Sequence, residues 1–260
     1  MRLDQWLTVQ GYAATRSRAR WLIETGQVWV NGQQCRKPSS SISDRCRVEV
    51  RGDGLPYVSR GGLKLEQALQ ALCLEVAGLV ALDIGASTGG FTDCLLRHGV
   101  RRVYALDVGT GQLAPVLRED LRVITLEGRN LRTFHAIELP EPVDLITVDV
   151  SFISLTLILP LLPPFLRQRG GVVALVKPQF EVGADAVGRG GIVRDSACRA
   201  LAVRRVLAVA AASGFRVMQS IEAPRSREQG NHETFIHLDW AAEHAAIADY
   251  HPCSSIGRRE

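Results

Sequence analysis

Five apolar stretches between residues 79 and 177 constrain the fold of this chain more than any other feature. Each is rich in β-branched and aliphatic residues, and helix-like segments separate them. The stretches are residues 79–83, 102–107, 122–127, 144–149 and 171–177. Near-continuous apolar strands are typical of a parallel sheet that is buried on both faces. Alternating strands and helices therefore predict a doubly wound α/β domain.

Each of these stretches ends on a charged residue. The five residues are Asp83, Asp107, Glu127, Asp149 and Lys177. A single aspartate at a strand end is often a helix cap or a solvated loop residue. Five in succession favour a site, because ligands of open α/β sheets bind beyond the carboxyl ends of the strands. The pattern predicts a ligand site at this edge of the sheet.

Composition excludes several classes of protein. The most apolar segment, residues 152–165, is shorter than the roughly 18 residues of a spanning helix, and Pro160, Pro163 and Pro164 interrupt it. The first ten residues lack the apolar region of a signal peptide. The six cysteines form no C-x-x-C pair, so neither a metal site nor a disulfide framework is predicted. We expect a cytoplasmic protein.

Charge is concentrated in the first fifth of the chain. Residues 1–55 carry nine basic and five acidic residues, which accounts for the whole net charge of +4. This excess indicates an anionic partner for the N-terminal segment, although a solvated charged face would give the same count. The chain also has only three lysines against 28 arginines. A lysine can lose its proton when it is desolvated, whereas an arginine cannot, so Lys64 and Lys177 are candidates for chemistry.

The N-terminal segment has the pattern of a small α+β module. Apolar residues predict a first helix from residue 3 that ends near Gly11. Thr15 is a plausible N-cap for a second helix over residues 16–25, which Gly26 would end. The Asn31–Gly32 pair that follows an apolar strand predicts a hairpin.

This segment resembles the RNA-binding domain first seen in ribosomal protein uS4. The resemblance is carried by the second helix, its glycine stop and the V-x-V-N-G hairpin, which occur in that order, and it implies binding to structured RNA. Arginine side chains suit phosphate oxygens, and we expect Arg16, Arg18 and Arg20 to cluster on the exposed side of the second helix. The RNA-binding candidates are Arg2, Arg16, Ser17, Arg18, Arg20, Lys37 and Arg60.

The loop after the first predicted strand of the second module reads DIGASTGGF, residues 83–91. Its D-x-G-x-x-x-G-G spacing differs from the G-x-G-x-x-G fingerprint of dinucleotide-binding folds. It resembles instead the pattern of S-adenosylmethionine (SAM) methyltransferases. In that fold, an acid at the end of the second strand holds the ribose of SAM, and Asp107 stands there. The resemblance implies a cofactor site formed by Asp83, Gly85, Ala86, Ser87, Gly89, Gly90, Phe91, Asp107, Val108, Glu127 and Asn130.

The residues after the fourth strand indicate the target atom. Methyltransferases that act on the amino group of adenine have an N/D-P-P-Y-like motif at this point, whereas this chain has DVSF at residues 149–152. An oxygen is therefore a better candidate target than a base amino group.

Lys64, Asp149, Lys177 and Glu233 resemble the K-D-K-E set of FtsJ-like ribose 2′-O-methyltransferases. With the uS4-type leader, the chain to about residue 240 resembles the TlyA family, bacterial rRNA methyltransferases also called haemolysin A. This implies a SAM-dependent enzyme that methylates a ribose, with cytidine as the expected nucleotide, in the small or large ribosomal subunit. It also implies a Rossmann-like domain over residues 56–240, an RNA-binding domain over residues 1–55 and a tail over residues 241–260. No metal is expected.

The resemblance implies roles for the four residues. Lys177 would act as the base that removes the hydroxyl proton, or would hold the hydroxyl as it loses its proton, and Asp149 and Glu233 would orient the lysines. Which lysine is the base stays open. Three alternatives also remain: a plain Lys177–Glu233 ion pair, an inactive RNA-binding assembly factor, and a membrane-lytic protein, which would need a spanning or strongly amphipathic helix.

Overall fold

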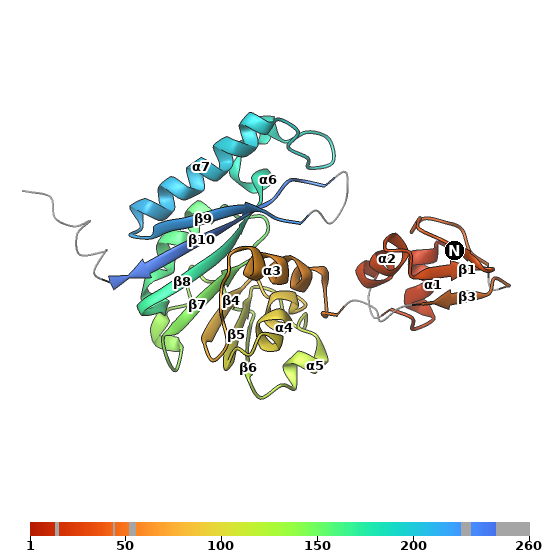
Figure 1. The fold of residues 1–260 in the computed structure, drawn as a ribbon, viewed down its shortest axis with the longest axis horizontal. Helices are drawn as coiled ribbons and strands as arrows, with labels where there is room; N and C mark the ends of the chain where they lie inside the picture. The colour runs from red at the N-terminus through yellow and green to blue at the C-terminus, as the bar shows by residue number, and fades with distance from the viewer. Residues whose placement is uncertain (14–15, 44, 52–55, 225–229, 243–260) are drawn as a thin grey trace, which may run out of the picture.

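The computed structural model describes residues 1–13, 16–43, 45–51, 56–224 and 230–242. Figure 1 shows a small N-terminal part beside a larger part built around one sheet. The expected N-cap at Thr15 lies outside the described residues, as does most of the predicted C-terminal tail.

The N-terminal part contains two helices and a small antiparallel sheet. The elements are α1 (Leu3–Val9), α2 (Arg16–Glu24), β1 (Val28–Val30), β2 (Gln33–Gln34) and β3 (Val48–Val50). The strand order is β2-β1-β3. Asn31 and Gly32 both have a positive φ, 50° and 78°, as a type I′ hairpin turn requires. The predicted hairpin is confirmed.

The larger part contains a seven-stranded sheet with the order β6-β5-β4-β7-β8-β10-β9. All neighbouring strands are parallel except where β10 pairs antiparallel with β8 and with β9. The five predicted strands and the doubly wound class are confirmed, and β8 begins five residues earlier than expected. The strands are β4 (Val80–Ile84), β5 (Arg102–Asp107), β6 (Val123–Glu127), β7 (Val143–Val148), β8 (Leu166–Val176), β9 (Arg216–Glu222) and β10 (Thr234–Ala241).

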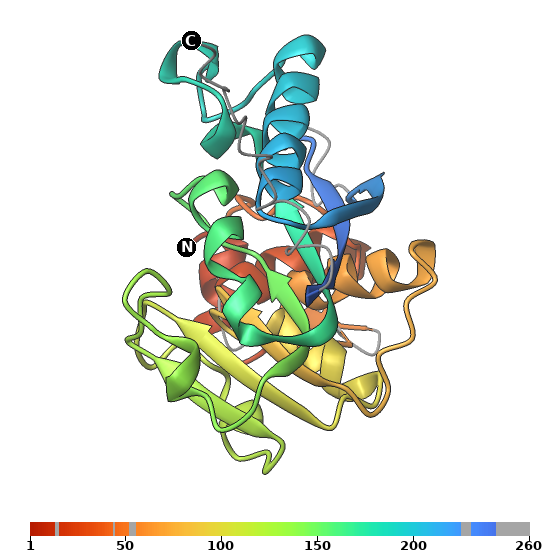
Figure 2. The same ribbon diagram turned by 90° about the vertical axis from the view of Figure 1, so that its left-hand side faces the viewer.

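Helices cover both faces of this sheet. On one face, α3 (Arg60–Ala71), α4 (Gly90–Arg97) and α5 (Pro115–Arg118) contribute to one apolar core. On the other face lies α7 (Ser196–Ala212), which is packed beside β9 in Figure 2. The short helix α6 (Pro178–Glu181) directly follows β8. Among the described helices, none is long and apolar enough to cross a bilayer.

Between β7 and β8 the chain forms three 3-10 turns: Leu155–Leu157, Leu159–Leu161 and Pro163–Phe165. Prolines in this segment lack the N–H that a longer helix would need. Two further 3-10 turns, Ala136–Glu138 and Ala184–Ala186, lie in other connections.

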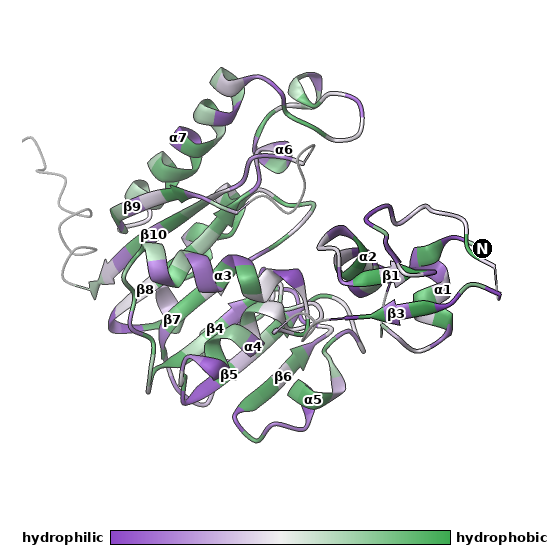
Figure 3. Ribbon diagram, turned by 45° about the vertical axis from the view of Figure 1, so that its right-hand side comes forward, coloured by the Kyte–Doolittle hydropathy of each residue, from purple (hydrophilic) through white to green (hydrophobic). Residues whose placement is uncertain are grey.

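The strand β4 shows how the sequence builds the two cores. All five of its residues are buried, and successive side chains of a strand point to opposite faces. Val80, Leu82 and Ile84 pack into the core under α7, whereas Ala81 packs toward α3 and α4. Figure 3 accordingly shows β4 as largely hydrophobic.

Candidate active site

Two lysine–carboxylate pairs lie at the carboxyl edge of the sheet. Lys177 Nζ is 2.7 Å from Asp149 Oδ1, and Lys64 is ion-paired with Glu233. All four side chains are at most about one quarter exposed, with Lys177 at 12% and Asp149 at 24%. The structure thus brings the four predicted residues into two pairs.

The topology explains this meeting. Asp149 and Lys177 directly follow β7 and β8, which are parallel neighbours. Glu233 directly precedes β10, which runs antiparallel to β8 with Thr234 opposite Val176. The alternative of a plain Lys177–Glu233 ion pair is wrong, because Lys177 pairs with Asp149 and Glu233 pairs with Lys64.

The glycine loop between β4 and α4 approaches the end of β7 closely. Gly85 has a φ of +83°, and a Cβ at this position would lie 2.6 Å from the backbone oxygen of Asp149. Only glycine fits there without a shift. The loop is therefore held beside the residue that pairs with Lys177.

Asp107 holds the same loop from the second strand. Its Oδ2 accepts a hydrogen bond from the N–H of Ser87 at 2.8 Å, and its Oδ1 accepts one from the N–H of Gly109 at 2.7 Å. Each carboxylate oxygen can accept two hydrogen bonds, so both oxygens keep acceptor capacity. Asp107 can thus hold the loop and a hydroxyl-bearing ligand together.

Asp83 lies elsewhere than the strand-end pattern suggested. It is fully buried, and its oxygens accept hydrogen bonds from Thr92 Oγ1 at 2.7 Å and Thr147 Oγ1 at 2.9 Å. Burial raises the pKa of Asp83 to about 6. The expectation that all five strand-end charges face a ligand is wrong for this residue, because β4 continues to Ile84 and turns Asp83 into the core.

Glu127 organises a neighbouring loop. Its carboxylate accepts hydrogen bonds from the N–H groups of Gly111, Gln112 and Leu113 and pairs with Arg118. The hydrogen bond from Leu113 is the largest cause of its lowered pKa. Its acceptor positions are therefore largely used within the protein.

The other cofactor candidates divide into buried and exposed residues. Ala86 and Phe91 are buried, and Gly90 is packed against α3, where a Cβ would meet Ser59 Oγ at 2.2 Å. Gly89 has a φ of +93°. Val108, by contrast, is 69% exposed next to Asp107.

Asn130 shapes its own turn, because its Oδ1 accepts a hydrogen bond from the N–H of Arg132 at 3.0 Å. This residue thus supports the segment after β6.

Comparison with known proteins identifies the family of the chain. Residues 57–240 match the FtsJ-like methyltransferase family, and residues 1–44 match the S4 domain. The chain belongs to the FtsJ-like methyltransferase family. Among its relatives is the 16S/23S rRNA (cytidine-2′-O)-methyltransferase TlyA of Mycobacterium tuberculosis, 42% identical over 95% of this chain and 92% of the relative.

Two further relatives are similar over nearly their whole length. Hemolysin A of Brachyspira hyodysenteriae is 40% identical over 92% of this chain and 99% of its own. A solved structure from Streptococcus thermophilus superposes with a TM-score of 0.74 at 41% identity, and covers 95% of both chains. The resemblance to the TlyA family is confirmed.

The S4 domain uses two of its candidate RNA-binding arginines internally. Arg2 and Arg16 both pair with Asp4, at 2.9 and 3.2 Å, and Asp4 is fully buried. These contacts lower the pKa of Asp4 to about 2, with the hydrogen bond from Arg2 as the largest cause.

The three arginines of α2 do not form one exposed cluster. Residues two apart on a helix lie about 200° apart, so Arg18 points away from the side that carries Arg16 and Arg20. Arg16 is exposed, whereas Arg18 and Arg20 are half-buried. Arg18 donates to the backbone oxygen of Tyr57 at 3.2 Å. The expected exposed cluster is wrong for this reason.

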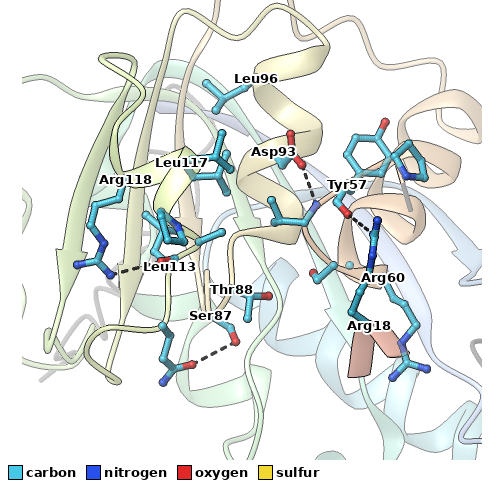
Figure 4. Close-up of a pocket in the computed structure, with 18 of the residues that line it drawn as sticks. Arg18, Tyr57, Arg60, Ser87, Thr88, Asp93, Leu96, Leu113, Leu117 and Arg118 are labelled. Carbon is cyan, nitrogen blue, oxygen red and sulfur yellow. Dashed lines mark hydrogen bonds between the residues drawn. The ribbon is translucent and has the colours of Figure 1, made fainter. Parts of the chain in front are cut away.

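The remaining RNA candidates are spread over both parts of the chain. Ser17 belongs to α2 and Lys37 is exposed. Arg60 begins α3 and lines a cleft of about 1590 Å³. Figure 4 shows Arg18, Tyr57 and Arg60 on one side of this cleft and Ser87 and Arg118 on the other. Lys64 and Asp149 also line it, so the cleft joins the S4 domain to the lysine–carboxylate pairs.

Sequence reasoning missed three polar or aromatic residues beside Lys177. Ser151 accepts a hydrogen bond from Lys177 Nζ at 3.0 Å. Phe152 has a left-handed φ of 64° and is 91% exposed, and its ring lies 5.3 Å from that of Phe180. The signal was present, because both phenylalanines lie within motifs that carry a candidate catalytic residue.

Proposed function

We propose that this protein transfers the methyl group of SAM to the 2′-hydroxyl of a cytidine ribose in ribosomal RNA of the small subunit, the large subunit or both. The observation that carries the proposal is the pair of lysine–carboxylate contacts beside the glycine loop. A relative with 42% identity over 95% of this chain is named for this activity.

The residues around the glycine loop fit SAM as the cofactor. Asp107 keeps acceptor capacity for the ribose hydroxyls, and Val108 offers an exposed apolar side chain beside it for the adenine. Backbone groups of the loop that turns at Gly85 would hold the methionine part of SAM. When bound, SAM supplies an activated methyl group on a sulfonium.

The lysines serve the hydroxyl that receives the methyl. Lys177 is ion-paired with Asp149 and donates a hydrogen bond to Ser151. Its nitrogen has three positions besides its bond to carbon, so one position remains for the oxygen of the substrate hydroxyl, and in the neutral amine this position is a lone pair that can accept the proton. A bond forms between this oxygen and the methyl carbon while the carbon–sulfur bond breaks, and the hydroxyl proton passes to Lys177 in its neutral form or to water. The remaining help is alignment of oxygen, carbon and sulfur.

Lys64 and Glu233 complete the edge of the site. Lys64 belongs to α3, is ion-paired with Glu233, and lines the cleft together with Asp149. Lys64 provides a second positive charge near the oxygen as it loses its proton, and Glu233 holds this lysine in place. The exposed ring of Phe152 suits stacking of an unpaired base, which would present its ribose to Lys177.

The S4 domain supplies RNA affinity in this proposal. It carries the net positive charge of the chain, and the cleft leads from its helices to Lys64 and Asp149. Base-independent contacts to phosphates would hold a structured RNA while one nucleotide enters the site. In this proposal, residues 1–55 form the RNA-binding domain and residues 56–240 form the methyltransferase domain.

A labelling experiment tests the proposal. Purified protein is incubated with SAM that carries a tritiated methyl group and with isolated small or large ribosomal subunits from a strain without the corresponding gene. We expect label in the RNA of at least one subunit. Binding of SAM without transfer to either subunit would instead support the inactive assembly factor.

A further inference from the structure

A buried carboxylate lies behind the active site without contacting it. Glu181 is the last residue of α6, four residues after Lys177, and is only 4% exposed. Burial raises its pKa. A carboxylate is tolerated in the interior where its oxygens are hydrogen-bonded, so the groups that Glu181 binds show what its burial serves.

The oxygens of Glu181 bind the loop that follows β7. Its Oε2 accepts a hydrogen bond from Ser154 Oγ at 2.5 Å, and its Oε1 accepts one from the N–H of Leu155 at 2.8 Å. We call residues 149–155 the β7 loop and residues 177–181 the β8 turn. Glu181 therefore fastens the far end of the β7 loop to the far end of the β8 turn.

The near ends of the same two segments carry the proposed chemistry. Lys177 of the β8 turn contacts Asp149 and Ser151 of the β7 loop. Between the two ends, Phe152 packs against Phe180 while it adopts its left-handed φ. Such a conformation persists only when its surroundings determine it. The bonds of Glu181 lie two and three residues beyond Phe152, where they limit how the loop can relax.

A third contact fixes Glu181 itself. Arg205 of α7 donates to the backbone oxygen of Glu181 at 3.3 Å. The backbone of Glu181, and with it the end of the β8 turn, is thus held to the helix that covers one face of the sheet.

We propose that Glu181 is a positioning residue, which sets the place of Asp149, Ser151 and Phe152 relative to Lys177. The inference rests on the proposed role of Lys177. Without the carboxylate, the β7 loop relaxes, and Lys177 loses the geometry that directs its remaining position at the substrate hydroxyl.

The test compares Glu181→Gln with Glu141→Gln. Glu141 is a matched control, because it also ties segments together through Arg101, Arg102 and Arg167, yet it precedes β7 at the end away from Asp149. In single-turnover methylation at saturating SAM and RNA, the amplitude reports the competent fraction and the rate constant reports the site.

We expect Glu181→Gln to lower the rate constant about tenfold or more, or about 1.4 kcal/mol of barrier. The amplitude and the dissociation constant of SAM should stay within about twofold of the wild type. Glu141→Gln should keep the rate constant. An unchanged rate constant in Glu181→Gln, or an equal fall in both variants, would overturn the proposal.

Ser154→Ala provides a milder variant if Glu181→Gln fails to fold, because it removes one of the two bonds to the carboxylate. We expect Ser154→Ala to lower the single-turnover rate constant as well, but by less than Glu181→Gln does. A wild-type rate constant in this variant, with Glu181→Gln unfolded, would assign Glu181 to folding alone.

Hydrogen exchange separates this proposal from the proposed function. In Glu181→Gln, amides of the β7 loop and the β8 turn should exchange faster than in the wild type, while Glu141→Gln leaves them unchanged. This readout needs no methyl transfer. Faster exchange in a protein whose wild type methylates no RNA would preserve the positioning role and refute only the function, whereas unchanged exchange would refute the positioning role.

Discussion

Each part of the molecule contains a fully buried aspartate, and the two are stabilised in opposite ways. In the S4 domain, Asp4 is neutralised by Arg2 and Arg16, and its pKa is lowered to about 2. In the methyltransferase domain, Asp83 accepts hydrogen bonds from the hydroxyls of Thr92 and Thr147 in place of ion pairs with arginines, and burial raises its pKa to about 6.

The difference shows how each part uses its charges. Two arginines of the S4 domain, Arg2 and Arg16, form ion pairs with Asp4 inside the domain. A count of basic residues therefore overstates how many positive charges are available to bind RNA. In the methyltransferase domain, threonine hydroxyls bind the buried Asp83, and the lysine–carboxylate pairs lie at the sheet edge. Activity should therefore depend on the identity of each residue at that edge, whereas RNA binding by the S4 domain should depend mainly on its net charge.

The largest effect is expected for Lys177→Arg, which keeps the charge at the edge. Arginine stays protonated at any accessible pH and cannot accept the hydroxyl proton. Single-turnover methylation should fall by more than about tenfold, equal to about 1.4 kcal/mol of barrier, while SAM and RNA still bind.

Lys37→Arg is the matched change in the S4 domain, where a positive charge suffices for a phosphate contact, and it should methylate at the wild-type rate. An equal loss in both variants would refute the contrast between the two parts.

A somewhat smaller effect is expected for Asp107→Ala. A lost hydrogen bond to a carboxylate removes about 1.5–3 kcal/mol, so SAM should bind roughly 10- to 100-fold more weakly in calorimetry. Asp83→Asn retains the shape of the buried site and should weaken SAM binding less. The reverse order would show that Asp83, rather than Asp107, holds the cofactor.

Acid should affect the two parts in opposite directions. Asp4 has a folded pKa of about 2, below the ordinary aspartate value of 3.8, so its contribution to stability is present above about pH 4 and is lost as the pH falls through 2. Asp83 has a raised pKa, so its contribution is largest below about pH 4 and is lost as the pH rises through 6.

Tryptophan fluorescence can follow the first of these changes, because Trp6, Trp21 and Trp29 lie in the S4 domain and only Trp240 lies elsewhere. We expect acid to unfold the S4 domain first, and Asp4→Asn to remove the dependence of its stability on pH between about 2 and 4. An identical acid transition in the variant would contradict the role of the two arginines.

The smallest effect is expected for single arginines of α2. Each lost phosphate contact reduces the slope of log binding constant against log salt by about 0.9 in duplex nucleic acid. Arg18→Gln should reduce the slope by about this amount, because Arg18 lines the cleft that leads to Lys64 and Asp149. Arg16→Gln should change the slope less, because Arg16 is paired with the buried Asp4. A larger change for Arg16→Gln than for Arg18→Gln would contradict this assignment.

The sequence predicted most of the large domain, because its strands are long, apolar and parallel. Parallel strands bring their carboxyl ends to one edge of a sheet, so Asp149 and Lys177 could be placed at the same edge without coordinates, although their direct pairing could not. The pairing of Lys64 with Glu233 could not, because it depends on how α3 packs against the sheet. Asp83 was misjudged because a shift of the strand end by one residue exchanges a rim position for a core position.

The S4 domain was harder to interpret for a different reason. Its helix and hairpin follow from local signals such as Asn31–Gly32, but the roles of its arginines depend on helix phase and on a buried partner. Asp4 gives no sign in the sequence that it is buried. Glu181 is similar, since only the fold brings it to Ser154 and Leu155.

The most direct test of the central claim is the location of the transferred methyl group. Ribosomal subunits methylated with trideuteromethyl SAM are digested to nucleosides and analysed by mass spectrometry. We expect a label on the ribose, as 2′-O-methylcytidine, with the wild type, and little or none with Lys177→Arg. A label on a base, or an equal label with the variant, would contradict the claim that Lys177 and its partners at the sheet edge act on a ribose hydroxyl.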